Sequence, residues 1–335
     1  MRSAFGTTFD APLGYLNTAS IGVPPAPVAS AVSDAVRRWT VGGDGPGAID
    51  SHVTTAREAF GRLVGVPSDR VAMGASASQL VALVAAGLPA DASVLVARGE
   101  FTSLTFPFAS RGLRVTEVDL DEVVAEAGAH DLVAVSVVQS ADGRVVDLEG
   151  LRATGVPVLL DASQAVGWMP LDLGWADWVV AVGYKFLMSP RGCAWLACSP
   201  SALERTVPVA ANWFAGDDPW STVYGLPLRL APDARRLDIS PVWLSQIGAA
   251  ASLPYLASLD LAAVRDHDVA LADAVLTGLG LPARGSAIVS LDLPSAGERL
   301  AAAGVRSSMR AGRVRLAFHL YNTVEDVDLV LTALA

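Results

Sequence analysis

Six short apolar runs, separated by helical or turn-rich stretches, constrain the fold of this chain more than any other feature. They lie at residues 70–73, 93–97, 132–138, 156–161, 178–182 and 194–197. Continuous runs of valine and leucine, without strict alternation with polar residues, are typical of strands buried on both faces. The sequence therefore predicts an α/β fold in which helices cover both faces of a mostly parallel sheet.

The remaining elements divide the chain into three parts. An irregular arm and a helix near residues 29–39 occupy residues 1–40, and the sheet lies in a large domain at 41–240. A linking helix at 243–258 leads to strands near 287–293 and 314–320 and to a final helix from Glu325. This order predicts a small α+β domain within residues 241–335. A chain of 335 residues with 52% hydrophobic content is long enough to form two cores.

Charge and composition exclude several classes of function. The net charge of -10 and the absence of a basic cluster argue against a nucleic-acid partner. No apolar run is long enough to cross a membrane, so we expect no membrane partner and a cytoplasmic protein. The two cysteines, Cys193 and Cys198, are expected to be buried core residues. The four histidines have no metal-ligand spacing, and no metal site is predicted.

Two charged side chains stand at the ends of predicted buried strands. Asp161 ends the run at 156–161, and Lys185 follows the run at 178–182. A buried lysine is costly unless its amine is neutralised, paired or covalently used, and lysine is rare in this chain. Ligands of open parallel sheets bind at the carboxyl ends of the strands. Asp161 alone fits a helix cap equally well, so the pair carries the prediction of a site.

A third feature lies upstream, in Gly74-Ala-Ser-Ala-Ser-Gln, between a strand and an apolar helix. Small residues at a helix N-terminus let backbone N–H groups and the Ser76 hydroxyl approach an anion. By itself this motif is also explained by an ordinary serine cap. Together with Asp161 and Lys185 it offers groups for the phosphate, the ring nitrogen and the aldehyde of pyridoxal phosphate.

Several segments, in order, resemble the class V aminotransferases, fold-type I pyridoxal phosphate enzymes that include cysteine desulfurases and isopenicillin N epimerase-like proteins. The resemblance is carried by Asp161-Ala-Ser-Gln-Ala-Val-Gly and by Gly183-Tyr-Lys-Phe-Leu-Met-Ser-Pro-Arg-Gly. It extends to the arm at 15–25, the segment at 100–108 and Arg313-Val-Arg-Leu-Ala-Phe-His-Leu-Tyr-Asn-Thr. It implies the fold-type I architecture, with a seven-stranded large-domain sheet, helices on both faces and a small C-terminal domain.

The resemblance also implies site roles. Lys185 would carry the cofactor as an internal aldimine and move the proton at the substrate Cα, while Asp161 would keep the ring nitrogen protonated. The residues implied in cofactor binding are Ser76, Ala75, Ala77, Phe101, Gln139, Gln164, Tyr184 and Ser240, the last at the phosphate of the second subunit. Arg315 would bind the substrate carboxylate in bidentate fashion. Asn17, Ser20 and Trp213 would lie on the substrate side.

These residues predict an enzyme that acts on a small amino acid by transamination or by Cα/Cβ elimination, for example as a C–S lyase. No cysteine follows Cys198, which disfavours a desulfurase that accepts sulfur on its own thiol. An amino-acid epimerase and a non-catalytic binding protein of the same fold are the alternatives. The resemblance also implies a homodimer with shared active sites. The aromatic loop at 212–225 is predicted to be either a lid or a dimer contact.

Overall fold

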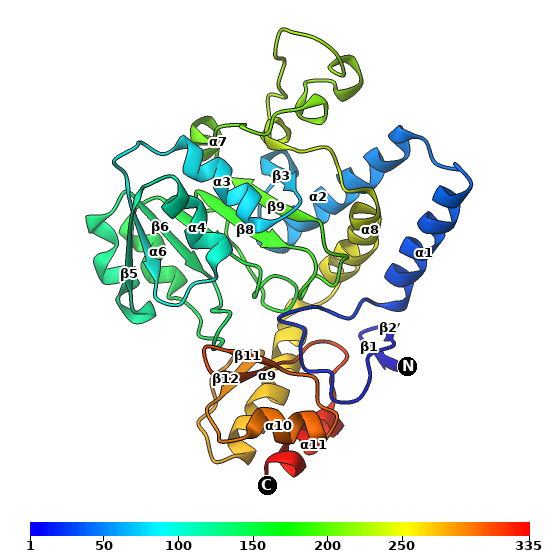
Figure 1. The fold of residues 1–335 in the computed structure, drawn as a ribbon, viewed down its shortest axis with the longest axis vertical. Coiled ribbons are helices and arrows are strands. Elements are labelled where there is room, and N and C mark those ends of the chain that lie inside the picture. The colour runs from blue at the N-terminus through cyan, green and yellow to red at the C-terminus, as the bar shows by residue number, and fades with distance from the viewer.

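A seven-stranded sheet forms the centre of the larger part of the molecule in the computed structural model, which describes residues 1–335 (Figure 1). Its strands, in chain order, are β3 (Val71–Gly74), β4 (Ser93–Ala97), β5 (Arg114–Val118), β6 (Leu132–Ser136), β7 (Val158–Asp161), β8 (Trp178–Val182) and β9 (Ala194–Cys198). The order across the sheet is β3-β9-β8-β7-β6-β4-β5. Only β9 runs antiparallel to its neighbours, so the predicted mostly parallel sheet is confirmed.

One strand of this sheet, β5, was not predicted from the sequence. It is one of the two edge strands, and Arg114, Thr116 and Glu117 keep it polar and at least partly exposed. Because these polar side chains are exposed, β5 lacks the continuous apolar run that identified the other strands, including the opposite edge strand β3, which is buried.

Helices cover both faces of the sheet, as predicted. They are α2 (Asp50–Val64), α3 (Ala77–Gly87), α4 (Thr102–Ser110), α5 (Val123–Glu126), α6 (Leu148–Thr154) and α7 (Pro200–Arg205). Strand β6 shows why both faces are apolar, because Val133 and Val135 pack in one core cluster while Leu132 and Ala134 pack in another. Short 3-10 helices connect these elements at Pro46–Ile49, Ser68–Arg70, Leu120–Glu122, Ala127–Ala129, Trp213–Ala215, Pro219–Ser221 and Ala234–Leu237.

The N-terminal arm joins distant parts of the chain. It begins with a hairpin of β1 (Arg2–Ala4) and β2 (Thr7–Phe9) and ends at α1 (Ala26–Thr40). Between them, the Leu16 amide donates to the Arg306 carbonyl at 3.0 Å, and the Leu16 carbonyl accepts from the Ala317 amide at 2.9 Å. The arm therefore runs beside the C-terminal unit, which Figure 1 shows below the large sheet.

The C-terminal unit is built on a three-stranded antiparallel sheet in the order β10-β12-β11. Its elements are α9 (Leu261–Gly278), β10 (Ile288–Leu291), α10 (Ala296–Ala302), β11 (Ser308–Arg310), β12 (Arg313–Ala317) and α11 (Val324–Leu334). Helix α8 (Trp243–Ala257) precedes the unit and packs against α1 and α2. Helices α9 and α10 and strand β11 were not predicted. The domain boundaries at residues 40 and 240 stay a prediction.

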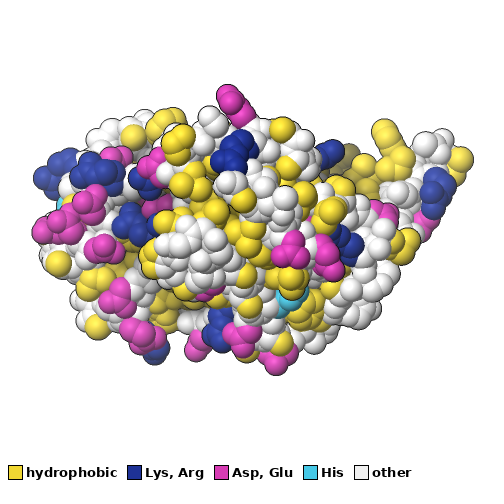
Figure 2. Space-filling view, turned by 90° about the horizontal axis from the view of Figure 1, so that it is seen from below, with side chains coloured by type: hydrophobic (Ala, Val, Ile, Leu, Met, Phe, Trp, Pro, Cys, Tyr) yellow, Lys and Arg dark blue, Asp and Glu magenta, His cyan; other side chains and the backbone are white.

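No single helix combines the length and the apolar composition needed to span a membrane. Helices α8 and α9 meet both criteria only when taken together, and they are bent by 92° relative to each other. On the face seen from the C-terminal unit, acidic and basic side chains lie among one another (Figure 2).

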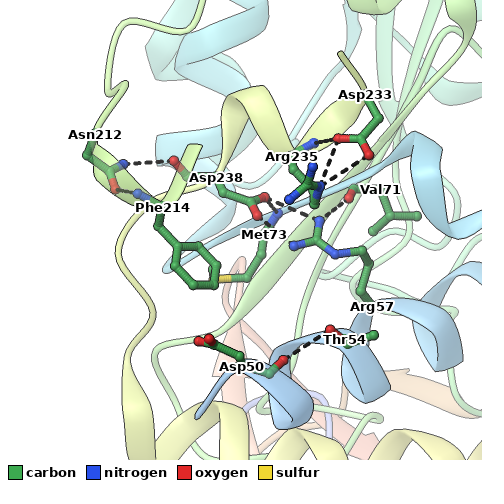
Figure 3. Close-up of polar contacts among 10 residues, drawn as sticks. All are labelled: Asp50, Thr54, Arg57, Val71, Met73, Asn212, Phe214, Asp233, Arg235 and Asp238. Carbon is green, nitrogen blue, oxygen red and sulfur yellow. Dashed lines mark hydrogen bonds and ion pairs between the residues drawn. The ribbon is translucent and has the colours of Figure 1, made fainter. Parts of the chain in front are cut away.

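A buried ion pair fixes the long segment between β9 and α8 to the large sheet (Figure 3). The Arg57 guanidinium on α2 donates to Asp238 at 2.5 Å, and the exposed side-chain fractions are 7% and 0%. Asp238 also accepts from the Met73 amide of β3 at 2.7 Å. Burial raises the pKa of the Asp238 carboxyl, and Arg57 opposes that rise. The Asn212 side-chain amide donates to the Asp238 carbonyl at 2.9 Å, which connects the aromatic loop to the same point.

Arg57→Ala is expected to lower the free energy of unfolding by about 3–5 kcal/mol, because it leaves the Asp238 carboxylate buried without its cation. Urea denaturation of the two proteins measures the difference. Arg98→Ala is the matched control, because Arg98 and Asp119 form an ion pair whose side chains are 62% and 65% exposed. The control is expected to change stability by about 1 kcal/mol at most. Equal effects of the two substitutions would contradict the assignment.

Candidate active site

The predicted site residues converge at the carboxyl ends of the parallel strands, where an open α/β sheet binds its ligands. A cavity of about 370 Å³ lies there. Nine of the predicted residues line it: Ser20, Ala75, Ser76, Ala77, Phe101, Asp161, Tyr184, Lys185 and Arg315. Asn17, Gln139, Gln164, Trp213 and Ser240 do not line it.

Lys185 is the only lysine of the chain, and its side chain points into this cavity. The residue is 8% exposed, and its amine makes no hydrogen bond or ion pair within the protein. The amine nitrogen lies 5.4 Å from the centre of the Phe101 ring. Burial lowers the pKa of Lys185 to about 8; the Asp161 carboxylate opposes this shift, while Arg315 and Arg310 add to it. At pH 7 a pKa of about 8 leaves roughly one tenth of the amine neutral and nucleophilic, far more than for an ordinary lysine.

The backbone around Lys185 is held by the N-terminal arm. The Gly22 amide donates to the Tyr184 carbonyl at 2.9 Å. A Cβ atom on Gly22 would collide with the Lys185 carbonyl oxygen, so only glycine allows the arm to approach this closely.

In the cofactor-free protein, the rate at which acetic anhydride modifies Lys185 is expected to rise with pH through a midpoint near 8. The sign follows because only the neutral amine reacts, and a rising pH increases its fraction. Mass spectrometry can follow this reaction without ambiguity, since the N-terminus is the only other amine. A midpoint near the ordinary lysine value of 10.5 would contradict the burial of the amine.

Asp161 ends β7 with its carboxylate held in one orientation. Its Oδ1 atom accepts from the Ser163 amide at 2.8 Å, and the Ser163 hydroxyl accepts from the Val182 amide at 3.2 Å. The residue is 6% exposed. A carboxylate fixed in this way beside the cavity is suited to pair with a protonated ring nitrogen.

The predicted anion cup is the N-terminus of α3. Ser76 caps the helix, and its hydroxyl accepts from the Gln79 amide at 3.3 Å. The amides of Ala77 and Ser78, in the first turn, have no intrahelical partner, which leaves them for an anion. The Ala75 amide instead donates to the Gln79 side chain at 2.8 Å, so it binds an anion only if this contact opens.

Arg315 on β12 is a buried cation without a carboxylate partner. It is 1% exposed, and its terminal nitrogens donate to the Ser140 carbonyl at 2.6 Å, the Ser140 hydroxyl at 2.9 Å and the Ser20 hydroxyl at 2.8 Å. Its Nε atom is buried and has no partner. Burial lowers the pKa of Arg315 to about 10, and Arg310 adds to the effect. A buried, unpaired guanidinium of this kind is suited to bind a ligand carboxylate.

Three predicted residues lie directly behind the cavity wall. The Gln164 amide donates to the Ala19 carbonyl at 3.1 Å and to Ser140 at 3.0 Å, while its oxygen is buried without a partner. The Asn17 side-chain oxygen is also buried and unpartnered. The Gln139 amide, in contrast, donates to the buried Glu100 carboxylate at 2.7 Å. Gln164 and Asn17 therefore each keep an unpaired acceptor, which lies outside the cavity lining, whereas the Gln139 amide is already bonded.

The last two predicted residues lie away from the cavity of their own chain. Trp213 packs against Trp220, with ring centres 5.1 Å apart, inside the aromatic loop. Ser240 is exposed at the end of the segment that Asp238 fixes. Within one chain, neither residue reaches the cofactor site.

Sequence reasoning missed six polar lining residues, Ser78, Ser103, Ser140, Ser163, Arg191 and Arg310. The four serines closely follow predicted residues along the chain, namely Ser76, Phe101, Gln139 and Asp161. This proximity could have identified them from the sequence. The Arg191 guanidinium lies 5.0 Å from the Tyr184 ring centre. Arg310 reaches the site only because the chain reverses at Ala311-Gly312, where both residues have positive φ angles.

A buried pair joins the C-terminal unit to the lysine segment. His319 Nδ1 lies 3.1 Å from an Asp268 oxygen, and His319 Nε2 lies 2.9 Å from the Phe186 carbonyl oxygen. A carbonyl only accepts, so Nε2 carries the hydrogen in this contact. Burial raises the pKa of the Asp268 carboxyl. This contact fixes the backbone immediately after Lys185 to helix α9.

A larger cavity, about 480 Å³, opens at the opposite, amino-terminal edge of the parallel strands. The charged groups that line it include Asp131, whose carboxylate accepts from Ser93, and Arg205, which pairs with Asp177 at 2.7 Å. None of the predicted site residues lines this larger cavity, so we place the active site at the smaller one.

Comparison with known proteins agrees with this geometry. The sequence matches the family model described as aminotransferase class-V over residues 47–285. An uncharacterised aminotransferase, YcbU of Bacillus subtilis (strain 168), is 27% identical over 317 residues, covering 84% of this chain and 82% of that protein. Isopenicillin N epimerase of Streptomyces clavuligerus is 29% identical over 182 residues, covering 47% of this chain and 46% of that enzyme.

Solved structures share the fold at low sequence identity. A cysteine desulfurase from Thermococcus onnurineus NA1 has a TM-score of 0.83 at 19% identity, covering 96% of this chain and 94% of that chain. The cystine C-S lyase C-DES, solved with its product cysteine persulfide, has a TM-score of 0.85 at 18% identity, with 97% of each chain covered. The predicted fold-type I architecture is thereby confirmed.

The lining residues fit pyridoxal phosphate. Four cationic side chains, of Lys185, Arg191, Arg310 and Arg315, face the single carboxylate of Asp161, so the cavity favours anionic groups such as a phosphate and a carboxylate. Free acceptor and donor atoms remain on Gln164 and Arg315. The family match includes both Asp161 and Lys185. The chain therefore belongs to the class V aminotransferase family and is a pyridoxal-phosphate-dependent enzyme of the aminotransferase or lyase type.

Proposed function

We propose that this protein is an aminotransferase that acts on a small α-amino acid. Arg315 binds the substrate α-carboxylate, Lys185 moves the proton at Cα, and Asp161 pairs with the protonated ring nitrogen of the cofactor. Bound pyridoxal phosphate supplies the electron sink for the charge left at Cα. A cavity of about 370 Å³ is at the lower end of ligand-pocket sizes, so the cofactor leaves room for a small substrate only.

The geometry supports specific tasks for these side chains. Lys185, with a pKa of about 8, exchanges a proton near neutral pH. The Ser163 amide fixes the Asp161 carboxylate, so this carboxylate keeps its orientation while the bound substrate reacts. Arg315 is fixed by Ser140 and Ser20, and its Nη2 atom, which donates only to Ser20, retains a second N–H for a carboxylate.

One observation supports the choice of reaction: the cavity lining contains one amine, and no imidazole or thiol. The other lining groups that can carry a proton are the Asp161 carboxylate, assigned to the ring nitrogen, and the Tyr184 phenol, whose ring packs 5.0 Å from the Arg191 guanidinium. Cys193 and Cys198 are both buried in the core, and burial raises the pKa of each thiol to about 12, so neither is a persulfide acceptor. Epimerisation by two bases and elimination with a separate acid both need a second proton carrier. Transamination needs one base that takes the proton and returns it on the same side.

The test is to incubate the holoenzyme with single amino acids and to measure keto acid and ammonia. For an aminotransferase, keto acid is expected in an amount equal to the enzyme, with turnover only after a keto-acid acceptor is added. Continued release of keto acid and ammonia without an acceptor would identify a lyase. Exchange of the Cα hydrogen in deuterated water with inversion would identify an epimerase.

We also infer that the enzyme works as a homodimer with shared sites. The aromatic loop projects from the body of the molecule (Figure 1), and Tyr224 is 90% exposed and Leu226 89% exposed. Large apolar side chains exposed together are typical of interfaces. The dimer supports a role for Ser240 and Trp213, which lie outside the cavity of their own chain. A cytoplasmic location stays a prediction.

Mixing two inactive variants tests the shared site. Lys185→Ala and Ser240→Ala chains, unfolded and refolded together, are expected to recover activity, because mixed dimers contain one site with both native residues. Light scattering measures the oligomeric state of the same samples. A monomeric active enzyme, or the absence of recovery together with a fully active Ser240→Ala variant, would contradict the shared site.

A further inference from the structure

A second arginine reaches the substrate side of the cavity from the strand next to that of Arg315. In the antiparallel pair β11 and β12, Ser308 lies opposite Arg315 and Arg310 lies opposite Arg313. Side chains two residues apart on a strand share one face, so Arg310 and Arg315 are diagonal neighbours on the same face. Both line the active-site cavity.

The two guanidinium groups converge on one hydroxyl. The Ser20 oxygen accepts from Arg315 at 2.8 Å and from Arg310 at 3.3 Å. The other contact of Arg310 is to its own neighbour, the Met309 carbonyl, at 2.7 Å. Neither arginine has a carboxylate within ion-pair distance, and a hydroxyl does not neutralise a cation. Two like charges held this close repel each other unless anions occupy the space in front of them.

The third arginine of the hairpin, Arg313, differs from these two because it has a carboxylate partner. Arg313 lies directly opposite Arg310, yet its guanidinium pairs with Asp292 at 3.4 Å, and both side chains are largely exposed. The chain therefore neutralises the arginine outside the cavity and leaves the two inside it unpaired. Because Arg315 is buried and Arg310 is half-buried at the end of the hairpin, Arg310 lies nearer the cavity mouth.

We propose that Arg310 selects substrates with a second carboxylate, so that the amino acid is a dicarboxylic one such as aspartate or glutamate. This inference rests on the proposed function in one respect, namely that Arg315 takes the α-carboxylate. Arg310 then binds the side-chain carboxylate nearer the mouth of the cavity. The Ser20 hydroxyl, which accepts from both guanidinium groups, holds them at fixed positions relative to each other. Neutral amides of the same shape can accept a hydrogen bond but leave the Arg310 charge unneutralised.

Kinetics with matched substrates test the selectivity. The native holoenzyme is expected to prefer aspartate over asparagine, or glutamate over glutamine, by about 10- to 100-fold in kcat/KM, the value of a charge-assisted contact. Arg310→Gln is expected to remove that preference by lowering kcat/KM for the acidic substrate only. Arg313→Gln, on the same hairpin, is the control and is expected to keep the preference. Equal losses for acidic and neutral substrates would overturn the proposal.

Binding of unreactive ligands separates this inference from the proposed reaction. Calorimetry compares succinate with butyrate, which lacks the second carboxylate, on the native holoenzyme and on Arg310→Gln. Tighter binding of succinate, lost in Arg310→Gln but kept in Arg313→Gln, supports the inference even if no amino acid is transaminated. Transamination of amino acids without any preference for succinate would overturn the inference and leave the proposed function intact. If the enzyme neither transaminated amino acids nor bound succinate more tightly than butyrate, both the proposed function and this inference would be overturned.

Discussion

Replacement of Lys185 by alanine is expected to lower kcat/KM by at least about 10²- to 10⁴-fold, the range for a side chain that moves a proton in the transition state. The chain contains no other lysine to take over the role. The removed side chain is also the group expected to bind the cofactor covalently, so the loss exceeds that of an acid–base residue alone. Steady-state kinetics with saturating pyridoxal phosphate measure the change.

Rescue by a small amine distinguishes a chemical role of Lys185 from a structural one. Added methylamine is expected to restore part of the activity of Lys185→Ala, because the vacated space in the cavity accepts an amine. Circular dichroism and thermal unfolding of the variant are expected to resemble those of the native protein. Near-native activity of Lys185→Ala without added amine would contradict the assignment of the site.

The second large effect is expected at Arg315. Arg315→Leu is expected to lower kcat/KM for amino acids by roughly 30- to several thousand-fold, because the substrate carboxylate enters a buried site without its cation. This loss corresponds to about 2–5 kcal/mol of transition-state stabilisation. Arg315→Lys retains the charge but lacks the planar fork, so an intermediate loss is expected. Steady-state kinetics of the three proteins with one amino acid give the comparison.

A substrate without a carboxylate provides the control for Arg315. The native enzyme is expected to prefer an α-amino acid to the corresponding primary amine, and Arg315→Leu is expected to abolish this preference while amine turnover stays unchanged. If the variant lost amine turnover to the same extent, the effect would lie in the fold around Ser140 and Ser20 instead. That result would remove the carboxylate-binding role.

The sequence predicted the parts of the fold that depend on burial. Strands β4, β6, β7 and β8 are buried on both faces and therefore left continuous apolar runs. Edge strand β5 has exposed arginine and glutamate side chains and left no such run. Helix α9 was missed because Arg265, Asp266, His267 and Asp268 interrupt its apolar spacing, although Asp268 is buried against His319. The partner of Asp268, His319, lies 51 residues later in the chain, so the local sequence pattern does not reveal that Asp268 is buried.

The site was predictable where a residue follows a strand. Asp161 and Lys185 stand after adjacent parallel strands, so the topology alone brings them to one edge. Gln139 also follows a strand, but the buried Glu100 carboxylate, 39 residues earlier, takes its amide. Arg310 was not predictable, because its place depends on the two-residue turn that aligns β11 with β12. Contacts set by a turn or by a buried charge need the folded structure.

The most direct test of the account is borohydride reduction of the holoenzyme, followed by mass spectrometry of the intact protein and of its peptides. The purified protein is expected to be yellow, and reduction is expected to attach one pyridoxyl phosphate group to the peptide that contains Lys185. Lys185→Ala, treated in the same way, is expected to carry none, since no other lysine is present. A colourless native protein that gains no mass after incubation with pyridoxal phosphate and reduction would contradict the central claim.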